Sequence, residues 1–404
     1  MTRSTIGSMF AGRRSRRQAE QNSTGSTTQT ICLATALIVV GIFVFAIVRF
    51  YQPGYGFTAL IGFPRGDFLV PAALRAVPHY EYPAVSYDGQ FYATRALDPM
   101  LTNPSIDSEM DDPPFRARRI LFSWTAYLAG FGRPALILDA YALQNAVAWL
   151  LLALLLCRWI PPTTPRGLAV WSASLLSHGL MWSVRFALLD GPSLLLIAVA
   201  VLLVEDHRTW ASAAVAGIAG LARETNVLAA LAQPFPRRAR GWLRTVVVAA
   251  PLLVWLDYLR SIYRSTLFAG TSGELGVPGV GLGHTASATW HLLRTHGVLS
   301  AAGLNVCILL PLLIQAMFLV CFRHWRDPWW RVAAGYAALM AFLPAVLWAP
   351  ETGAISRVML PLTIGFNVLL AKQPRARFWP WFVAGNLHVI PALFVMPLLS
   401  SASL

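Results

Sequence analysis

Charged side chains are scarce in this chain. Asp, Glu, Lys and Arg make up 12% of its 404 residues, whereas hydrophobic residues make up 56%, and the mean hydropathy is +0.56. Soluble domains carry about a quarter charged residues, so this composition excludes an ordinary soluble domain. The sequence therefore predicts an integral membrane protein.

The chain has fewer acidic residues than basic residues. The chain has 18 Asp and Glu against 32 Lys and Arg, which gives a net charge of +14. Such a charge invites a nucleic-acid partner, but the basic residues lie in short clusters between apolar runs. That placement is typical of cytoplasmic loops under the positive-inside rule. We therefore expect membrane lipids as partners and no nucleic acid.

Cysteine pairs and nucleotide-binding motifs are also lacking. The four cysteines fall in apolar runs without paired spacing, which predicts neither a disulfide framework nor a metal site. The chain has no Walker loop, no dinucleotide fingerprint and no GxSxG elbow, so an activated substrate would have to supply the energy for any reaction. No internal repeat is convincing, which weakens an inverted-repeat transporter interpretation.

The apolar runs predict an all-α, polytopic bundle. Residues 1–30 are interpreted as a disordered, basic cytoplasmic tail, and residues 31–404 as a single transmembrane domain. Counting every candidate gives about 10–11 spans, at residues 31–49, 118–131, 137–157, 167–183, 189–204, 209–232, 243–259, 301–321, 331–349, 356–371 and 379–400.

Basic clusters fall on one side of these expected spans. The N-terminus is then cytoplasmic, and two loops lie outside: residues 50–115, interpreted as a catalytic loop, and residues 260–300. A high Arg and Ala content with little Lys is typical of GC-rich bacterial genomes. We therefore expect a multi-pass protein of the bacterial cytoplasmic (inner) membrane.

The sequence leaves the side of Asp190 open. The run 118–131 is short for a span. If this run crosses the membrane, Asp190 lies on the cytoplasmic side, opposite Asp88. If it only dips into the bilayer, Asp190 joins Asp88 outside, and the run 209–232, broken at Arg223-Glu224, would restore the parity as two half-helices.

The outer loop 50–115 concentrates the acids of the chain. It holds eight of the eighteen, and Tyr87-Asp88-Gly89-Gln90-Phe91-Tyr92 places one among aromatic rings, which are good platforms for a sugar or a polyprenyl chain. Gly89 permits a tight turn that would present the carboxylate. Asp88 is our candidate catalytic base, and the alternative is a carboxylate that caps a short helix. The acids between 107 and 112 predict a solvated acidic face.

Arginines follow the acids where the chain re-enters the membrane. Arg116, Arg118 and Arg119 lie on the outer side, against the positive-inside bias, and Arg357 begins a later apolar run from the same side. Guanidinium groups pair well with phosphate oxygens, so these residues are candidates for binding a lipid phosphate. The alternative is simple anchoring at the membrane interface.

Ionisable residues also lie within apolar runs. Arg185 and Asp190 flank a Phe-Ala-Leu-Leu stretch, and Arg223-Glu224 interrupts the run 209–232. Such residues are costly in a membrane and are functional candidates by default. The alternative is an internal ion pair. Because adjacent residues on one helix cannot face each other, Arg223 and Glu224 each need another partner or a break in the helix.

In their order, these stretches resemble the GT-C class of membrane glycosyltransferases. The resemblance rests on the span that precedes the Tyr-Asp-Gly-Gln-Phe-Tyr loop and on four further motifs. These are Arg118-Arg119-Ile120-Leu121, Arg185-Phe-Ala-Leu-Leu-Asp190-Gly-Pro, Leu221-Ala-Arg223-Glu224-Thr225-Asn226 and Ser356-Arg357-Val-Met-Leu-Pro361. The motifs cover roughly residues 31–371 and look closer to a bacterial membrane branch of the class.

This resemblance implies transfer of a sugar from a polyprenyl-phosphate donor to a lipid, glycan or other envelope acceptor on the outer face. It implies catalytic roles for Asp88 and Asp190. The residues expected to bind substrate are Tyr87, Gln90, Tyr92, Arg118, Arg119, Arg185, Arg223, Glu224 and Arg357. No cofactor is required by the pattern, and a divalent cation, Mg²⁺ or Mn²⁺, is left open.

A transporter or flippase of a lipid-linked or anionic substrate is the main alternative. It accounts at least as well for Arg185, Asp190, Arg223 and Glu224, since charges lining a path through the membrane would serve transport. It accounts poorly for the acidic outer loop. A third interpretation, a scaffold subunit of an envelope complex, has no sequence feature in its favour.

Overall fold

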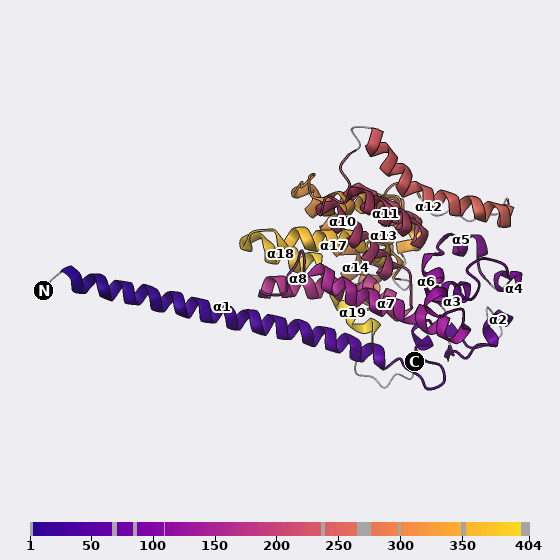
Figure 1. Ribbon diagram of the computed structural model, residues 1–404, viewed down its shortest axis with the longest axis horizontal. Coiled ribbons are helices and arrows are strands. Elements are labelled where there is room, and N and C mark those ends of the chain that lie inside the picture. Colours follow the sequence, from indigo (N-terminus) through magenta and orange to yellow (C-terminus); the bar gives the residue numbers. More distant parts are fainter. Residues whose placement is uncertain are drawn as a thin grey trace.

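The computed structural model describes residues 3–66, 71–83, 87–108, 110–235, 239–264, 276–297, 300–348 and 353–396. Most of these residues are helical, which confirms the helical class. Among them, the one sheet pairs β1 (Phe63–Pro64) with β2 (Glu81–Tyr82) in parallel. In Figure 1 the N-terminal part of α1 (Arg3–Val48) projects from a helical bundle, and the short helices that follow it lie together at one end of that bundle.

Short elements make up the segment between α1 and the bundle. Besides the two strands, they are η1 (Thr58–Leu60), α2 (Ala72–Arg75), α3 (Gly89–Leu97), α4 (Pro104–Asp107), α5 (Pro113–Arg118) and α6 (Leu121–Ala129). Asn103 and Asp112 cap α4 and α5 by accepting hydrogen bonds from the backbone N–H groups of Ser105 and Phe115, and proline follows each cap. Both features favour helix starts, so this segment repeatedly begins new helices.

The bundle begins at α7. Its elements are α7 (Pro134–Leu156), α8 (Pro165–Leu175), α9 (His178–Arg185), α10 (Asp190–Glu205), α11 (Thr209–Ala222), η2 (Glu224–Ala232), α12 (Ala239–Tyr263), α13 (Val280–His296), α14 (Ala301–Cys321), α15 (Pro328–Ala341), η5 (Ala345–Trp348), α16 (Ala354–Val358), α17 (Leu360–Ala371), α18 (Arg375–Gly385) and α19 (Val389–Val395). Large aromatic side chains fill its core, among them Trp149, Trp329, Trp348, Tyr141 and Tyr336.

Four described helices are long and apolar enough to cross a membrane. They are Ser26–Val48, Pro134–Leu156, Gly241–Tyr263 and Ala302–Cys321, and the bent pair of α18 and α19 would make a fifth span. This is fewer than the 10–11 continuous spans expected, because several apolar runs are divided. Ser177, in extended backbone, separates α8 from α9, and Met359 separates α16 from α17.

The tail also differs from the expectation. Residues 3–30, which the sequence predicts to be disordered, continue the helix of the first span, so that α1 begins at Arg3. Once a helix has nucleated in an apolar span, each added residue costs little. The Arg, Ala, Gln and Glu residues of this stretch are good helix formers.

The short run 118–131 does not form a long helix. Its helix, α6, has nine residues and a length of about 13 Å, less than half of the roughly 30 Å hydrocarbon thickness. The run 209–232 forms α11 and η2, divided at Arg223, whose backbone is extended (φ −162°, ψ 135°). Asp190 and the Asp88 segment lie at the same end of the bundle and share Arg357 as a neighbour.

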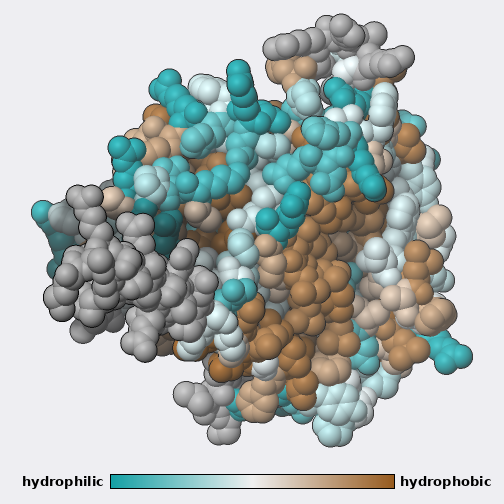
Figure 2. All heavy atoms as spheres, turned by 60° about the vertical axis from the view of Figure 1, so that its left-hand side comes forward, coloured by the Kyte–Doolittle hydropathy of each residue, from teal (hydrophilic) through white to brown (hydrophobic). Residues whose placement is uncertain are grey.

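The outer faces of the long helices are apolar. Leu37 and Phe45 on α1, Leu154 on α7, Val254 on α12 and Val320 on α14 are 60–73% exposed. Figure 2 shows a continuous hydrophobic area on one face of the molecule, with hydrophilic side chains above it. Side chains of this kind are stable against lipid and not against water. The chain is therefore a multi-pass membrane protein.

Two glycines bring together three segments that lie far apart in the sequence. A Cβ on Gly89 would lie 2.0 Å from the carbonyl oxygen of Phe186, and one on Gly179 would lie 2.2 Å from that of Ser356. Only glycine leaves room for such backbone contacts. Gly89 therefore serves this close approach at the start of α3, and not the tight turn that we expected from the sequence.

Gly179→Ala should destabilise the protein by about 1–3 kcal/mol, because the added methyl would push α9 away from α16. Gly41→Ala is the matched control, since no atom lies within 4 Å of a Cβ at that position of α1. It should not destabilise the protein, because alanine is a better helix former than glycine. Thermal unfolding of the purified variants in detergent measures both, and equal melting temperatures would contradict the close approach.

Candidate functional site

Five arginines gather at the end of the bundle that carries the short helices. Arg116, Arg118 and Arg119 come from α5 and the turn after it, Arg223 from the break between α11 and η2, and Arg357 from α16. Their side chains are only 5–15% exposed. We call these five residues the arginine cluster. Buried guanidinium groups require counter-charges, and four carboxylates supply them.

Asp190 joins two members of the arginine cluster. Nη1 of Arg357 donates to its Oδ2 at 3.1 Å, and Nη1 of Arg223 donates to its Oδ1. The Asp190 side chain is 4% exposed. Arg223 thus pairs across the bundle with Asp190, not with its neighbour Glu224, as the geometry of adjacent residues requires.

Glu224 and Tyr92 connect the remaining arginines. Nε of Arg119 donates to Oε2 of Glu224 at 3.1 Å, and Nε of Arg118 lies 3.7 Å from Oε1. The Tyr92 hydroxyl accepts from Nη1 of Arg116 at 3.3 Å and from Nη1 of Arg119 at 3.2 Å. The guanidinium groups are therefore held in fixed positions by oxygen atoms between them.

Asp88 lies at the open edge of the arginine cluster. Nη2 of Arg116 donates to its Oδ1 at 2.9 Å, and its side chain is 39% exposed. Asp88 directly precedes α3, but its carboxylate makes no capping hydrogen bond. This contact with Arg116 argues against the simple capping alternative and leaves part of the carboxylate accessible.

The surroundings of Asp88 favour its charged form. Burial acts to raise the pKa of Asp88, but Arg116, Arg357 and Arg119 outweigh it and hold this pKa below its ordinary value. The carboxylate is therefore ionised at neutral pH. Its contribution to stability is present above the ordinary Asp pKa of about 3.9 and is lost as the pH falls through the lowered folded-state pKa. Its partial exposure screens this contribution.

Tyr87 contacts Arg357, the same arginine that binds Asp190. Nη2 of Arg357 donates to the Tyr87 hydroxyl at 3.1 Å. The Tyr87 ring stacks on Phe186, with 4.6 Å between ring centroids, and meets Trp182 edge to face at 6.0 Å. Tyr87, Asp88 and Tyr92 of the outer motif thus each contact an arginine of the cluster.

One residue expected in the site, Arg185, lies elsewhere. The Arg185 guanidinium lies 4.9 Å from the ring centroid of Phe50 and 4.7 Å from that of Phe186, and its Nη1 donates to the carbonyl of Ala59 at 3.4 Å. It therefore ties α9 to the end of α1 instead of joining Asp190. Gln90, the second residue of α3, is 2% exposed.

Two of the acids between 107 and 112 bind basic side chains. Asp111 accepts from Nη2 of Arg116 at 2.6 Å and from Nε at 3.0 Å. Asp107 accepts from Arg95 and, at 2.8 Å, from the hydroxyl of Tyr263. The predicted solvated face therefore holds only in part, since Asp111 is 45% exposed but both acids are paired with arginine, and Glu109 lies outside the described residues. The helix-starting prolines beside Asp111 were the available signal.

Phe115 was not predicted. Its ring lies beneath three guanidinium groups, those of Arg119 at 4.2 Å, Arg118 at 4.8 Å and Arg116 at 5.5 Å. Arginine is stabilised over an aromatic face. A phenylalanine directly before Arg-Ala-Arg-Arg was the only signal in the sequence.

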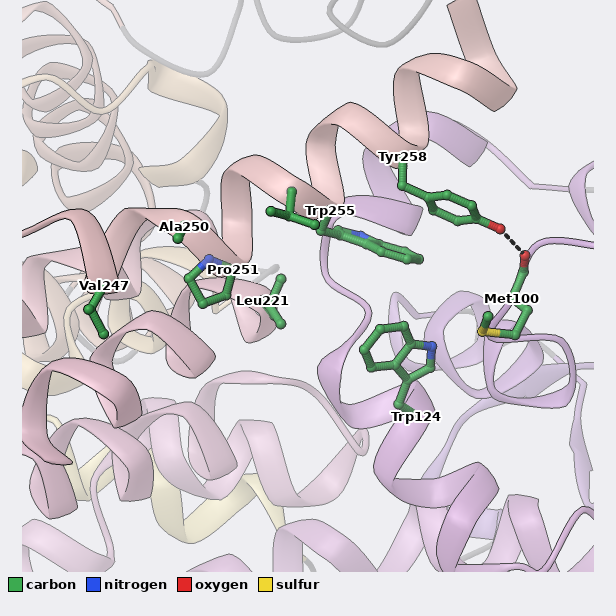
Figure 3. A pocket seen from close by; sticks show the side chains of 9 residues that line it. Met100, Trp124, Leu221, Val247, Ala250, Pro251, Trp255 and Tyr258 are labelled. Atoms are coloured by element: carbon green, nitrogen blue, oxygen red, sulfur yellow. Dashed lines mark hydrogen bonds between the residues drawn. The ribbon is translucent and has the colours of Figure 1, made fainter.

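An apolar groove of about 700 Å³ borders the arginine cluster (Figure 3). It is lined by Met100, Trp124, Leu221, Val247, Ala250, Pro251, Val254, Trp255 and Tyr258. Leu221 lies two residues before Arg223, and Nε1 of Trp255 donates to the carbonyl of Ala117 at 2.9 Å, between Arg116 and Arg118. Most of the groove is lined by α12, and it meets the cluster at the end of α11 and at α5.

The carboxylates present do not suit a divalent cation. Asp88 and Asp111 both bind Arg116, so a cation would have to displace that arginine and lie beside several other guanidinium groups. Over the described ranges, no group of three or more His, Cys, Asp or Glu residues could hold a metal ion. We therefore derive no step that uses Mg²⁺ or Mn²⁺.

The chain matches no protein-family model, no curated protein and no solved structure. Function must therefore be argued from the chemistry of the site. Buried guanidinium groups select an anion such as phosphate, and the groove beside them accepts an apolar chain. A single molecule with both parts would fill both features.

Asp190→Asn should destabilise the protein by about 3–5 kcal/mol, because two buried guanidinium groups would lose their shared counter-charge. Asp206→Asn is the control, since its pair with Arg158 is 3.9 Å long and both side chains are at least 46% exposed. It should cost less than about 1 kcal/mol. Thermal unfolding in detergent compares the two, and an equally small effect of both variants would contradict the bridging role of Asp190.

Proposed function

We propose that this protein is a membrane glycosyltransferase that transfers a sugar from a polyprenyl-phosphate donor to a hydroxyl of a lipid, glycan or other envelope acceptor. The observation that carries the proposal is the arginine cluster beside the apolar groove, with Asp88 accessible at its edge. A polyprenyl-phosphate sugar has an anionic head and a long apolar chain, which match these two features. The resemblance to GT-C enzymes in the order of the motifs points the same way.

The arginine cluster would bind the donor phosphate. Negative charge develops on this phosphate as the bond between the sugar and its oxygen breaks, and fixed guanidinium groups stabilise that charge. Asp190 is almost fully buried between Arg223 and Arg357, so we assign it the role of positioning these arginines. A role as the acid or base of the reaction fits it less well.

Asp88 would receive the proton of the acceptor hydroxyl. The hydroxyl oxygen forms its bond to the anomeric carbon while the bond to phosphate breaks, which releases polyprenyl phosphate and inverts the anomeric configuration. The lowered pKa of Asp88 makes it a weak base in the resting site. When phosphate binds Arg116, that arginine favours the carboxylate less, and the pKa of Asp88 rises towards the range of a useful base.

The proposal includes an orientation in the bacterial cytoplasmic membrane. Lys372 and Asp327 form an ion pair of 2.5 Å, which joins the loop before α15, with Arg323 and Arg326, to the loop before α18, which Arg375 and Arg377 follow. Figure 1 draws α18, which follows the second loop, away from α3, α5 and α6. Under the positive-inside rule, these loops and the N-terminus are cytoplasmic and the arginine cluster faces outward.

A transporter of an anionic or lipid-linked substrate is the second candidate. Buried polar pairs inside the bundle favour it, since Asn367 and Asn386 exchange hydrogen bonds of 3.1 Å and Thr363 donates to Gln315 at 3.0 Å. These pairs carry no charge, whereas the charged residues form a single group with the outer motif. That grouping is better suited to a reaction at one membrane face than to a path across it.

Asp88→Asn should abolish transfer without loss of the protein from the membrane, because the amide cannot take the proton. The test compares lipid and surface-glycan mass spectra of a deletion strain rescued with wild type, with Asp88→Asn, or with Asp257→Asn. Asp257 is an exposed acid on α12 and serves as the matched control. We expect the missing sugar to return with wild type and Asp257→Asn only. Full rescue by Asp88→Asn would overturn the proposed reaction and favour the transporter.

Ala250→Trp should weaken the use of donors with long prenyl chains, because the indole would fill the groove. We expect the KM for a long-chain donor to rise about tenfold, which corresponds to about 1.4 kcal/mol, while a short-chain donor is used normally. Val246→Trp on the same helix, where the side chain is 60% exposed and outside the groove, is the control. If Ala250→Trp affected the long-chain and the short-chain donor equally, the groove would not be the binding site of the prenyl chain.

A further inference from the structure

A second cavity lies between the loop before α8 and the loop before α18. Its volume is about 590 Å³, and its lining includes Trp159, Thr164, Arg166, Arg375, Phe378 and Trp379. It opens beyond the C-terminal end of α7, whose 23 residues extend about 35 Å. In Figure 1, α8 and α18 lie away from α3, α5 and α6, so this cavity is separate from the arginine cluster and its groove.

Two arginines give this cavity uncompensated positive charge. The Arg166 guanidinium lies 4.4 Å from the ring centroid of Phe378, and its Nη2 donates to the carbonyl of Gln373 at 2.5 Å. Its Nε is buried and has no hydrogen-bond partner among the residues that the structure describes. Within the same residues, neither Arg166 nor Arg375 forms an ion pair, whereas the nearby Lys372 is paired with Asp327.

The backbone adds to this positive charge. Both α8 and α18 begin at the cavity, and each has 11 residues, so the positive ends of two helix dipoles meet there. Thr164 caps α8 by accepting from the N–H of Gly167 at 3.1 Å. Gly167 also lets two backbone segments of the cavity wall pack closely, since a Cβ at that position would lie 2.2 Å from the carbonyl oxygen of Pro161.

Aromatic side chains form the apolar part of the same cavity. Trp379 is 42% exposed, and the indole N–H of Trp159 donates to Glu205 at 2.7 Å, which fixes that ring. Tryptophan is enriched where membrane proteins meet the headgroup region, because an indole has an apolar body and a polar N–H. Paired arginines beside such rings fit a phosphate that is attached to an apolar body.

We propose that this cavity binds the headgroup of an anionic membrane phospholipid. The lipid phosphate lies between Arg166 and Arg375, at the starts of α8 and α18, and the glycerol and upper acyl chains lie against the exposed Trp379. Basic pockets between transmembrane helices are suited to such lipids. This binding would join the loop after α7 to the loop after α17, and it does not depend on the proposed transferase activity.

The test measures lipid binding by the full chain. Purified protein in detergent is titrated with phosphatidylglycerol and, separately, with phosphatidylcholine, and bound lipid is counted by native mass spectrometry. We expect Arg375→Ala to weaken phosphatidylglycerol binding about tenfold, since a charge-assisted contact is lost. Arg377→Ala, an exposed arginine on the same helix that does not line the cavity, should bind within about twofold of wild type.

A second variant separates binding from folding. Arg166→Gln should also weaken phosphatidylglycerol binding, and the melting temperature of each variant without lipid shows whether the fold is kept. Because Arg375 is exposed, its variant should melt like wild type. Equal losses in Arg375→Ala and Arg377→Ala, or equal binding of phosphatidylcholine, would overturn the proposal. Displacement of the lipid by an equal concentration of inorganic phosphate would also overturn it, in favour of a site for small anions.

Discussion

The bridge that Asp190 makes between Arg223 and Arg357 is the interaction on which the site depends. Burying a guanidinium group without a counter-charge costs several kcal/mol, and here two such groups from distant helices share one carboxylate that is 4% exposed. The bridge fixes the break after α11 against α16. Through the Tyr87 hydroxyl, which Arg357 contacts, it also fixes the start of the outer motif.

The backbone makes this convergence possible. Phe186 and Ser356 approach Gly89 and Gly179 at distances that no side chain would permit, and the extended backbone of Arg223 turns its guanidinium away from Glu224. The two glycines remove side chains from the helix surface, and the extended backbone of Arg223 interrupts a helix. The helical bundle is therefore least regular where its charges meet. Irregular backbone inside a membrane protein is tolerated only when other groups satisfy its polar atoms.

The sequence predicted the helical class, the break at Arg223-Glu224 and most residues of the charged group, for one physical reason. Ionisable residues in apolar runs must find partners, which singled out Asp190, Arg223 and Glu224, but the sequence did not predict which groups would pair. The number of continuous spans was not predictable in this way, because hydropathy averages across breaks such as that at Ser177. The role of Phe115, the contacts of Arg185 and the groove depend on approaches between distant segments, which no local pattern encodes.

The carboxylates of the arginine cluster differ in exposure, so some are fixed in place and others can be exchanged for another anion. Five guanidinium groups share four carboxylates, and of these Asp190 is enclosed, whereas Asp88 and Asp111 are 39% and 45% exposed. Exposed ion pairs are weak, so in the proposed reaction the donor phosphate would displace the carboxylates at Arg116 more readily than Asp190. The same exchange would free Asp88 from its arginine at the moment a substrate arrives. A single carboxylate can then serve as the counter-charge of the empty site and as the base of the occupied one.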